Sequence, residues 1–496
     1  MYILIPFVLA CGGDKDDTGS LGTAPAPYEA EPGIALREDG WLRGDLHMHT
    51  THSDGWDDLS TVIDLAEYLV DDLFLAAHPE YTDNQLDFIS ITDHRTVDGQ
   101  SDPAYQSDML ILIGGEEFGS TGHAGVHGIH EFVDHDPDGD GVSVEDYQAA
   151  IEFTHEIGGT FSPNHPMLPR LQFPWAVDGF DGVEIWNAGW GLMVEANTME
   201  NVEEWESQYG ASSATFRRAV VEAGNASEQA LAWYEALLAR GHHTAVIGGS
   251  DRHAVFLPGF PTTWVFSDGM DEAGVMQGIE ARHTFVARTP VSAQVLLTVD
   301  VDGESYQMGD AIPIQGETEV IISVQVGRGD GGKVRLVGGG YVATDEDLDD
   351  AELGEILVES DIEGDDFVLE VIRTVSPGDW LYPMVLEPLI RPDADDIRAS
   401  EVRVFAEAVV ATGAEDFLGI ANMTADYADS EVLVNSAECD PAQWNPDLLQ
   451  CFPVDPDGFA SMFVPDYLDR ALNVIAVDGE ITDWTMGAIG SAVVFE

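Results

Sequence analysis

Five short apolar runs, each followed at once by histidine or acidic residues, constrain this chain more than any other feature. The first leads into "DLHMHT" at 45–50, where His47 and His49 stand two apart, with Asp54 a few residues on. Alternate residues of an extended strand share one face, so both imidazoles can face one metal ion. The other runs are 86–92, 109–115, 159–164 and 244–250, and they lead into Asp93-His94, Glu116-Glu117, His165, and Asp251 with His253.

These runs belong to an alternating pattern between about residues 41 and 290. Segments with apolar residues at helical spacing, such as 60–70, 144–157 and 227–241, separate the strand-like runs. The alternation predicts an α/β fold in which parallel strands are wrapped by helices, and at this length a barrel. The carboxyl ends of barrel strands form one rim, where active sites are built. We therefore expect the histidines and acids to meet at one place.

The residue types at this rim indicate a metal centre. Imidazole and carboxylate ligands suit Zn²⁺, Mn²⁺ or Fe²⁺, and the absence of cysteine from this region argues against a thiolate site. Any one of these residues, taken alone, has an ordinary structural alternative as a hydrogen-bonded histidine at a strand end. The recurrence at five separate strand ends favours the metal centre.

The same motifs, in this order, resemble the PHP (polymerase and histidinol phosphatase) superfamily. They are "DLHMHT" with "SDG", "ITDH", "GGEEF", "NHP" and "GSDRH". The resemblance covers about residues 41–290 and implies a distorted (β/α)7 barrel that holds two or three divalent metal ions. The metal ligands that it implies are His47, His49, Asp54, His94, Glu117, His165, Asp251 and His253.

The resemblance also implies a metal-dependent hydrolase whose ions activate water. A further family histidine follows the glutamate, and "STGHAGVHG" offers His123 and His127, of which the small residue after "GH" favours His123. We expect His123 to be the catalytic general acid if it is not a ligand, with Asp251 as the alternative. Within the superfamily, "GEEF", "SPNHP", "VEIWN" and the β-rich region that follows are most similar to the branch containing carbaryl hydrolase.

The scarcity of basic residues narrows the range of expected substrate classes. A phosphate pocket usually recruits arginine or lysine, and the chain has no lysine between residues 16 and 332. We therefore expect a small ester, carbamate or amide, with a PHP phosphoesterase as the alternative and a non-catalytic surface binding protein as the second alternative. Trp186 and Asn187 end "VEIWN" at the same rim and are expected to bind substrate, although core packing is an equal alternative for Trp186.

Three further residues near the ligands are expected to have other roles. Asp45 and Asp93 each adjoin a ligand histidine and are expected to orient it. Arg252 lies between two ligands and faces the other way in a strand, which favours an ion pair. His52 is expected to lie outside the centre.

The pattern changes after Pro290. Runs at 293–303, 318–327, 332–339 and 365–373 alternate apolar and polar residues between Gly/Asp turns, which is typical of a β-sandwich. We assign residues 41–290 to the barrel, 291–425 to a β-sandwich domain and 426–496 to a C-terminal appendage.

A second ion site is suggested by "DHDPDGDGVSVEDY" at 134–147. Acidic residues at alternate positions, with one at the twelfth, are typical of calcium loops, although the glycine at the eighth position departs from that pattern. The candidate calcium ligands are Asp134, Asp136, Asp138, Asp140 and Glu145. A solvated acidic loop is the alternative.

The net charge limits the partners. The chain carries 92 acidic and 19 basic residues, for a net charge of −73. Such a field repels nucleic acid and anionic lipid, so we exclude both and expect a small-molecule substrate. The oligomeric state cannot be read from the sequence.

The N-terminus indicates export. Residues 1–11 form a short apolar run that ends at Cys11, and residues 12–40 read as a flexible linker. This resembles a bacterial lipoprotein signal with lipidation at Cys11, although no basic residue precedes the apolar run. The alternative is a disordered apolar N-terminus. In an exported, lipid-anchored protein, Cys439 and Cys451 are expected to form a disulfide.

Overall fold

The chain divides into two compact units, of which the structure describes residues of only one. The units are Met1–Ala35 with Arg391–Pro465, and Leu36–Ile390 with Asp466–Glu496. The structure is a computed structural model and describes Leu36 and residues 40–55, 57–68, 86–120, 122–137, 139, 141–168, 171–187, 198–209, 216–217, 220, 226–253, 258–342, 348, 353–388, 474–477 and 480–496. All of these residues belong to the second unit.

The first half of this unit is built on short buried strands. Parallel pairing joins β1 (Trp41–Asp45), β2 (Phe88–Ile91) and β3 (Ile111–Phe118), and also joins β6 (Gly182–Asn187) to β7 (Ala245–Gly249). Every residue of β1, β2, β6 and β7 is buried. Burial on both faces explains why β2 and β7 are nearly continuous apolar runs in the sequence.

The prediction of an all-parallel barrel is wrong for four strands. Antiparallel pairs are formed by β4 (Ala124–His127), β5 (Thr160–Pro163), β8 (Thr262–Phe266) and β9 (Thr284–Ala287). The connection between β3 and β4 is residues 119–123, which is too short for the crossover that parallel strands need. The described residues therefore form a mixed α/β fold with one large mixed sheet and a separate antiparallel sheet.

The helices that the sequence predicts at 60–70, 144–157 and 227–241 are confirmed. The described helices are α1 (Leu59–Tyr68), the 3-10 helix η3 (Asp98–Ser101), α3 (Val144–Glu156), α5 (Met199–Tyr209), α7 (Ala226–Ala239) and α8 (Glu272–Glu280). Helix α3 begins where the Ser143 side chain accepts from Asp146 N and the Asp146 side chain accepts from Ser143 N. Such a reciprocal cap satisfies two donors that a helix start leaves open. Helix α1 buries Val62 and Ala66 against Ile89 of β2.

The second half is β-rich, as the alternating pattern predicts. A four-stranded antiparallel sheet contains β11 (Glu304–Gln307), β10 (Gln294–Val301), β13 (Thr318–Gly327) and β16 (Asp366–Val375) in that order. In β13, Val320 and Ile322 are buried while Glu319 and Gln325 are exposed. The period-two pattern therefore gives one core face and one solvent face.

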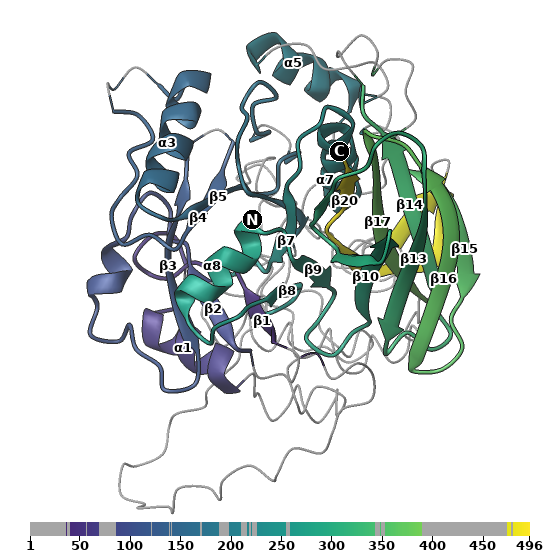
Figure 1. Ribbon diagram of the computed structural model, residues 1–496. Helices are drawn as coiled ribbons and strands as arrows, with labels where there is room; N and C mark the ends of the chain where they lie inside the picture. Colours follow the sequence, from purple (N-terminus) through teal and green to yellow (C-terminus); the bar gives the residue numbers. More distant parts are fainter. Residues whose placement is uncertain are drawn as a thin grey trace, which may run out of the picture. The chain divides into compact units, whose positions relative to one another are not determined.

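The large sheet continues into this half of the chain. Its remaining strands are β12 (Ala311–Ile312), β14 (Lys333–Gly340), β15 (Glu355–Asp361), β17 (Asp379–Pro388), β18 (Val474–Val477), β19 (Glu480–Gly490) and β20 (Val493–Phe495). Figure 1 shows β13–β17 in green. Strand β19 pairs with both β17 and β9, and β10 contacts β17 and β19. The end of the predicted appendage thus joins the main sheet, while the boundaries at 291 and 426 stay predictions.

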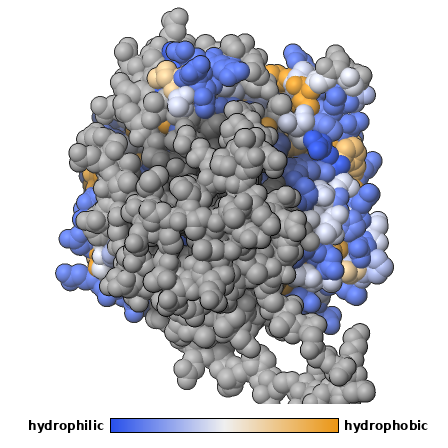
Figure 2. All heavy atoms as spheres, turned by 180° about the vertical axis from the view of Figure 1, so that it is seen from behind, coloured by the Kyte–Doolittle hydropathy of each residue, from blue (hydrophilic) through white to orange (hydrophobic). Residues whose placement is uncertain are grey.

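The described surface is mainly hydrophilic on the face that Figure 2 shows. In the view from behind in Figure 2, the described residues are mostly hydrophilic, with hydrophobic ones scattered between them. Within the described residues, no helix combines the length and apolarity that spanning a membrane requires.

Candidate metal centre

His47 and His49 lie just beyond the end of β1, in a segment that runs beside Asp251 and Arg252. Met48 forms a parallel bridge with Arg252, and His49 N donates to Arg252 O over 2.9 Å. Both imidazoles are buried. Gly249 is required at the end of β7, because a Cβ at this position would overlap the Cβ of His47. Close approach of β1 and β7 therefore delivers two of the predicted strand ends to one place.

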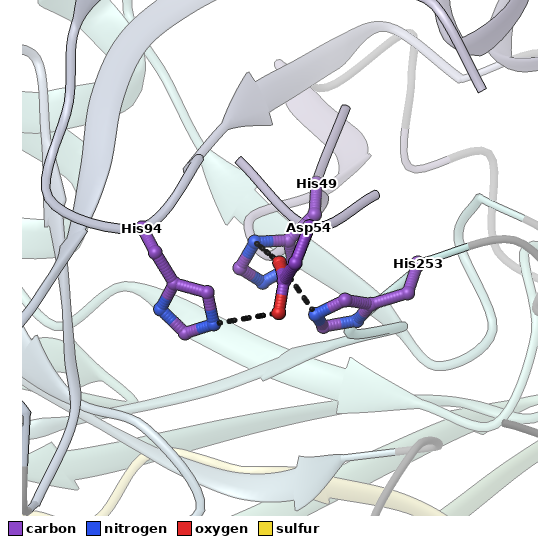
Figure 3. A group of neighbouring side chains, drawn as sticks. All are labelled: His49, Asp54, His94 and His253. Atoms are coloured by element: carbon purple, nitrogen blue, oxygen red, sulfur yellow. Dashed lines mark ion pairs between the residues drawn. The ribbon is translucent and has the colours of Figure 1, made fainter. Parts of the chain in front are cut away.

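The first group of ligand atoms contains His49, Asp54, His94 and His253, which Figure 3 shows converging. Asp54 Oδ1 lies 3.1 Å from His253 Nε2 and 3.8 Å from His49 Nδ1, and Asp54 Oδ2 lies 3.6 Å from His94 Nε2. Asp54 is the exposed member of the group, at 47% of its side-chain surface. The group therefore has one open side.

Glu117, at the end of β3, is shared between groups. Its carboxylate lies 3.0–3.4 Å from the nearest ring nitrogen of five histidines, and is buried to 1% exposure. These histidines are His47, His49, His94, His123 and His165. Two groups contain this carboxylate: His47 with Glu117 and His165, and His94 with Glu117 and His123. A carboxylate in this position can contact two cations at once.

Asp251 completes a fourth group with His47 and His49. Its Oδ1 lies 3.3 Å from the Nε2 atoms of both histidines. Asp251 has a φ of 48° and His165 has a φ of 30°, in the left-handed region that few non-glycine residues adopt. Such local strain is concentrated at functional sites, where the surrounding structure holds it in place.

Electrostatics keep the shared carboxylates ionised. Burial alone would raise the pKa of Glu117, but the imidazoles of His123, His47 and His94 outweigh it and hold that pKa well below its usual range. The pKa of Asp251 is likewise held well below its usual range, against burial, by His47, His49 and His253. Burial and the neighbouring His253 lower the pKa of His49 to about 4. The carboxylates in turn raise the pKa of His47 and of His94 against burial, and a bound cation would replace the protons on these imidazoles.

The donor set fits divalent cations. His49 Nδ1 is buried and has no hydrogen-bond partner within the described part of the chain. The Nε2 atoms of His47 and His49 lie 3.1 Å apart, an arrangement that a shared cation would stabilise. Within the same part of the chain, neither Glu117 nor Asp251 forms an ion pair with lysine or arginine. These buried clusters are consistent with divalent metal ions, which suit such nitrogen and oxygen donors.

Two residues that the sequence did not single out support the ligands. Glu184 of β6 accepts from His47 Nδ1 over 2.9 Å and from His165 N over 2.8 Å. Asn164 donates its amide to Glu117 Oε1 over 3.0 Å. Partners of this kind fix the orientation of metal-binding histidines. Glu184 lies inside "VEIWN" and Asn164 inside "NHP". The signal in the sequence was a polar residue within a buried strand or directly after one.

The predicted ligands and the two candidate histidines are placed as follows. All eight predicted ligands belong to one or more of the four groups, and His123 joins them. His127 instead lies with its Nδ1 3.1 Å from Ser90 Oγ. Of the two candidate histidines, His123 therefore lies in a ligand group, and His127 lies in none of the four.

The residues expected to bind substrate are buried. Trp186 belongs to the main hydrophobic core cluster, which favours packing. Asn187 donates its amide to Glu184 Oε2 over 2.9 Å and to Asp251 Oδ2 over 3.3 Å. This arrangement gives Asn187 a positioning role, and contact with substrate stays a prediction for both residues.

The neighbouring polar residues lie outside the four groups. Asp93 accepts from Thr50 N and from Thr50 Oγ1, both over 2.7 Å, and Asp45 accepts from His47 N over 3.0 Å, so both acids fix the loop that carries the ligands. Arg252 forms an ion pair with Asp57. His52 lies 3.2 Å from Asp102.

The candidate calcium loop shows turn contacts. Asp136 Oδ1 accepts from Gly139 N over 2.9 Å, and Asp134 and Glu145 are exposed. Asp138 and Asp140 lie outside the described residues, and so do Cys11, Cys439 and Cys451. Calcium binding, the lipid anchor and the disulfide therefore stay predictions.

Comparison with known proteins gives distant structural likenesses. No protein-family profile matches the sequence, and neither does any curated protein sequence. A two-domain protein from Bacteroides vulgatus, described as containing a predicted PHP-like metal-dependent phosphoesterase, is 14% identical with a TM-score of 0.28, over 69% of this chain and 90% of its own. The lesion-specific endonuclease EndoQ from Pyrococcus furiosus is 12% identical with a TM-score of 0.26, over 48% of this chain and 56% of its own. At these scores the functional argument rests on the site itself.

Proposed function

We propose that this protein is a metal-dependent hydrolase of the PHP superfamily that holds two or three divalent ions, Zn²⁺, Mn²⁺ or Fe²⁺. The observation that carries the proposal is the set of four overlapping ligand groups, which share His47, His49, His94 and Glu117. Nine side chains are too many for one ion of four to six ligands. Sharing of ligands between groups is what neighbouring ions require.

Each ion would be held by residues from different strand ends. Divalent ions bound there would activate water and polarise the substrate's carbonyl or phosphoryl oxygen. Glu184 accepts from His47 Nδ1, which leaves His47 Nε2 facing Glu117 and Asp251. Asn187 links Glu184 to Asp251, so the two buried carboxylates are oriented together. The open side at Asp54 is where substrate would enter.

His123 and Asp251 are the candidates for proton transfer. His123 Nδ1 lies 3.2 Å from Glu117 Oε1, within one of the ligand groups, and we propose that it is a ligand. The role of general acid then falls to Asp251 or to a bound water. The metal content of a His123 variant separates the two roles. Loss of a ligand lowers the amount of bound metal, whereas loss of a general acid does not.

We propose a small ester, carbamate or amide as substrate, as in the branch that contains carbaryl hydrolase. Arg252, which lies between two candidate ligands, is engaged with Asp57 and is turned away from the centre. The alternative is a phosphoester, and the residue that favours it is Arg95, which is exposed directly after His94. An arginine at this position could contact a substrate phosphate.

The test is hydrolysis by the full chain supplied with Zn²⁺, Mn²⁺ or Fe²⁺. We expect 4-nitrophenyl acetate to be cleaved faster than 4-nitrophenyl phosphate, and the double variant His47→Ala with His49→Ala to cleave neither. His52→Ala is the matched control, because His52 contacts Asp102 outside the four groups. Metal binding without hydrolysis of any ester, amide or phosphoester would contradict the proposal and favour the non-catalytic binding protein.

We also propose, from the sequence alone, that the protein is an exported lipoprotein with a small-molecule substrate and no nucleic-acid partner. Mass spectrometry of the membrane-bound protein should find a diacylglyceryl group on Cys11, and Cys11→Ser should release the protein in soluble form. A wild-type protein that is soluble and unmodified would contradict the anchor.

A further inference from the structure

A pocket formed by α7 and by strands of the large sheet is lined by residues that do not belong to the metal centre. Its volume is about 180 Å³. A cavity of about 150 Å³ holds a benzene molecule, so this pocket can hold a small organic molecule. Its lining residues are Ser227, Glu228, Leu231, Glu235, Arg335, Val337, Gly354, Ile356, Tyr382, Met384 and Met486.

The floor of the pocket is an apolar strand face. Val337 lies opposite Tyr382, and Arg335 lies opposite Met384, in the antiparallel pairing of β14 with β17. Val337, Met384 and Met486 are at most 5% exposed. Methionine side chains are flexible and polarisable, and they adapt to an apolar ligand.

A carboxyl group closes one end of this apolar surface. Glu235 of α7 lines the pocket, is partly buried, and accepts a hydrogen bond from Tyr382 Oη. Gly354, with a φ of 42°, lies so close that a Cβ there would overlap the carboxyl group. Burial raises the pKa of Glu235 to about 7, against the hydrogen bond from Tyr382. Placing a carboxyl among apolar groups costs free energy unless a partner compensates it.

A guanidinium group lies further along the same strand face. Arg335 is two residues from Val337, a distance of about 7 Å along an extended strand. Its Nε donates to Glu359 Oε2 over 2.8 Å, and its side chain is 16% exposed. The pocket therefore presents a carboxyl group and a guanidinium cation, together with apolar side chains.

We propose that this pocket binds a small zwitterion with an apolar side chain, of the class of the apolar α-amino acids. The ammonium group would contact Glu235, the carboxylate would contact Arg335, and the side chain would pack on Met384, Met486 and Leu231. With a simple amine, the Nη atoms of Arg335, whose Nε is bonded to Glu359, would receive no anion from the ligand, and with a simple carboxylate Glu235 would receive no cation. The zwitterion matches Glu235, Arg335 and the apolar side chains of the lining.

Isothermal titration of the full-length wild-type protein with L-leucine tests the proposal. We expect saturable binding with a Kd of about 1 mM or tighter, and affinity about tenfold lower or more for 3-methylbutylamine and 4-methylpentanoate, which each lack one charge. The same loss is expected for L-leucine with Glu235→Gln and with Arg335→Gln. Glu319→Gln, on the exposed face of β13, is the matched control and should bind as the wild type does.

Three results would overturn the proposal. These are no saturable binding of L-leucine, L-methionine or L-phenylalanine by the wild type, equal affinity of Glu235→Gln, or equal affinity of the amine and the amino acid. Thermal unfolding gives a second readout, since L-leucine should raise the Tm of the wild type and of Glu319→Gln only. Arg335→Gln still decides the question if Glu235→Gln does not fold, and no result depends on metal or on hydrolysis.

Discussion

Glu184→Gln tests the idea that a carboxylate outside the ligand groups holds the centre together. Glu184 is 1% exposed, and its two oxygens accept three hydrogen bonds. Oε1 accepts from His47 Nδ1 over 2.9 Å, and Oε2 accepts from His165 N over 2.8 Å and from Asn187 Nδ2 over 2.9 Å. Glutamine keeps the size of the side chain and only one of the two acceptor oxygens.

The expected loss follows from this geometry. The amide nitrogen of glutamine must face either His47 Nδ1 or the donors on His165 and Asn187, so at least one hydrogen bond to a charged acceptor is lost. Such a bond contributes about 1.5–3 kcal/mol. If that free energy serves to orient His47 and His165 toward the ions, metal affinity falls by about 10- to 100-fold, in the range found for such supporting residues.

The assay is competition for Zn²⁺ against a chelator of known affinity, for wild type and Glu184→Gln. Glu272→Gln is the matched control, since Glu272 also accepts from a backbone N–H, that of Gly114, but lies outside the four ligand groups. An affinity within twofold of the wild type, in a Glu184→Gln protein that unfolds cooperatively, would refute the reasoning.

Three further predictions follow from other contacts. Asp57→Asn removes the carboxylate that forms an ion pair with the buried Arg252, so the free energy of unfolding in urea should fall by about 3 kcal/mol; an unchanged midpoint would contradict this. The pKa of Glu235 is raised from 4.5 to about 7, so its burial favours the protonated acid: the contribution of this one group to stability is complete below about pH 4.5 and falls by up to about 3 kcal/mol as the pH rises from there through 7. Glu235→Gln should remove that part of the pH dependence, and an identical profile would sink the assignment. His123→Gln should lower both bound metal and hydrolysis, whereas full metal with lost hydrolysis would make His123 the general acid.

Most of the candidate ligands could be singled out from the sequence because they follow an apolar run closely. In "DLHMHT" the two-residue spacing of His47 and His49 implied a shared face, and the two imidazoles lie with their Nε2 atoms 3.1 Å apart. His253 is two residues from Asp251, and both lie in ligand groups. Local spacing and strand direction are properties of the sequence itself, so these residues could be found without coordinates.

Other features depend on contacts between distant segments. Glu184 reads as one polar residue in the strand "VEIWN", and its role depends on His47, which is 137 positions away. The antiparallel pairing of β4 with β5 joins strands on either side of helix α3, and the apolar pattern does not specify it. The pairing of β19 with β9 joins residues slightly more than two hundred positions apart, and the pattern around β19 is weak. The periodicity and the composition of a sequence do not specify which distant strands or side chains contact each other.

Metal analysis of the purified full chain tests the central claim most directly. The protein should be prepared without chelator, and its Zn, Mn and Fe should be counted per chain by mass spectrometry, before and after equilibration with each metal. We predict two or three ions per chain in the wild type, and a loss of most of them in the double variant His47→Ala with His49→Ala. A wild-type protein that holds no ion and gains none on equilibration would contradict the account.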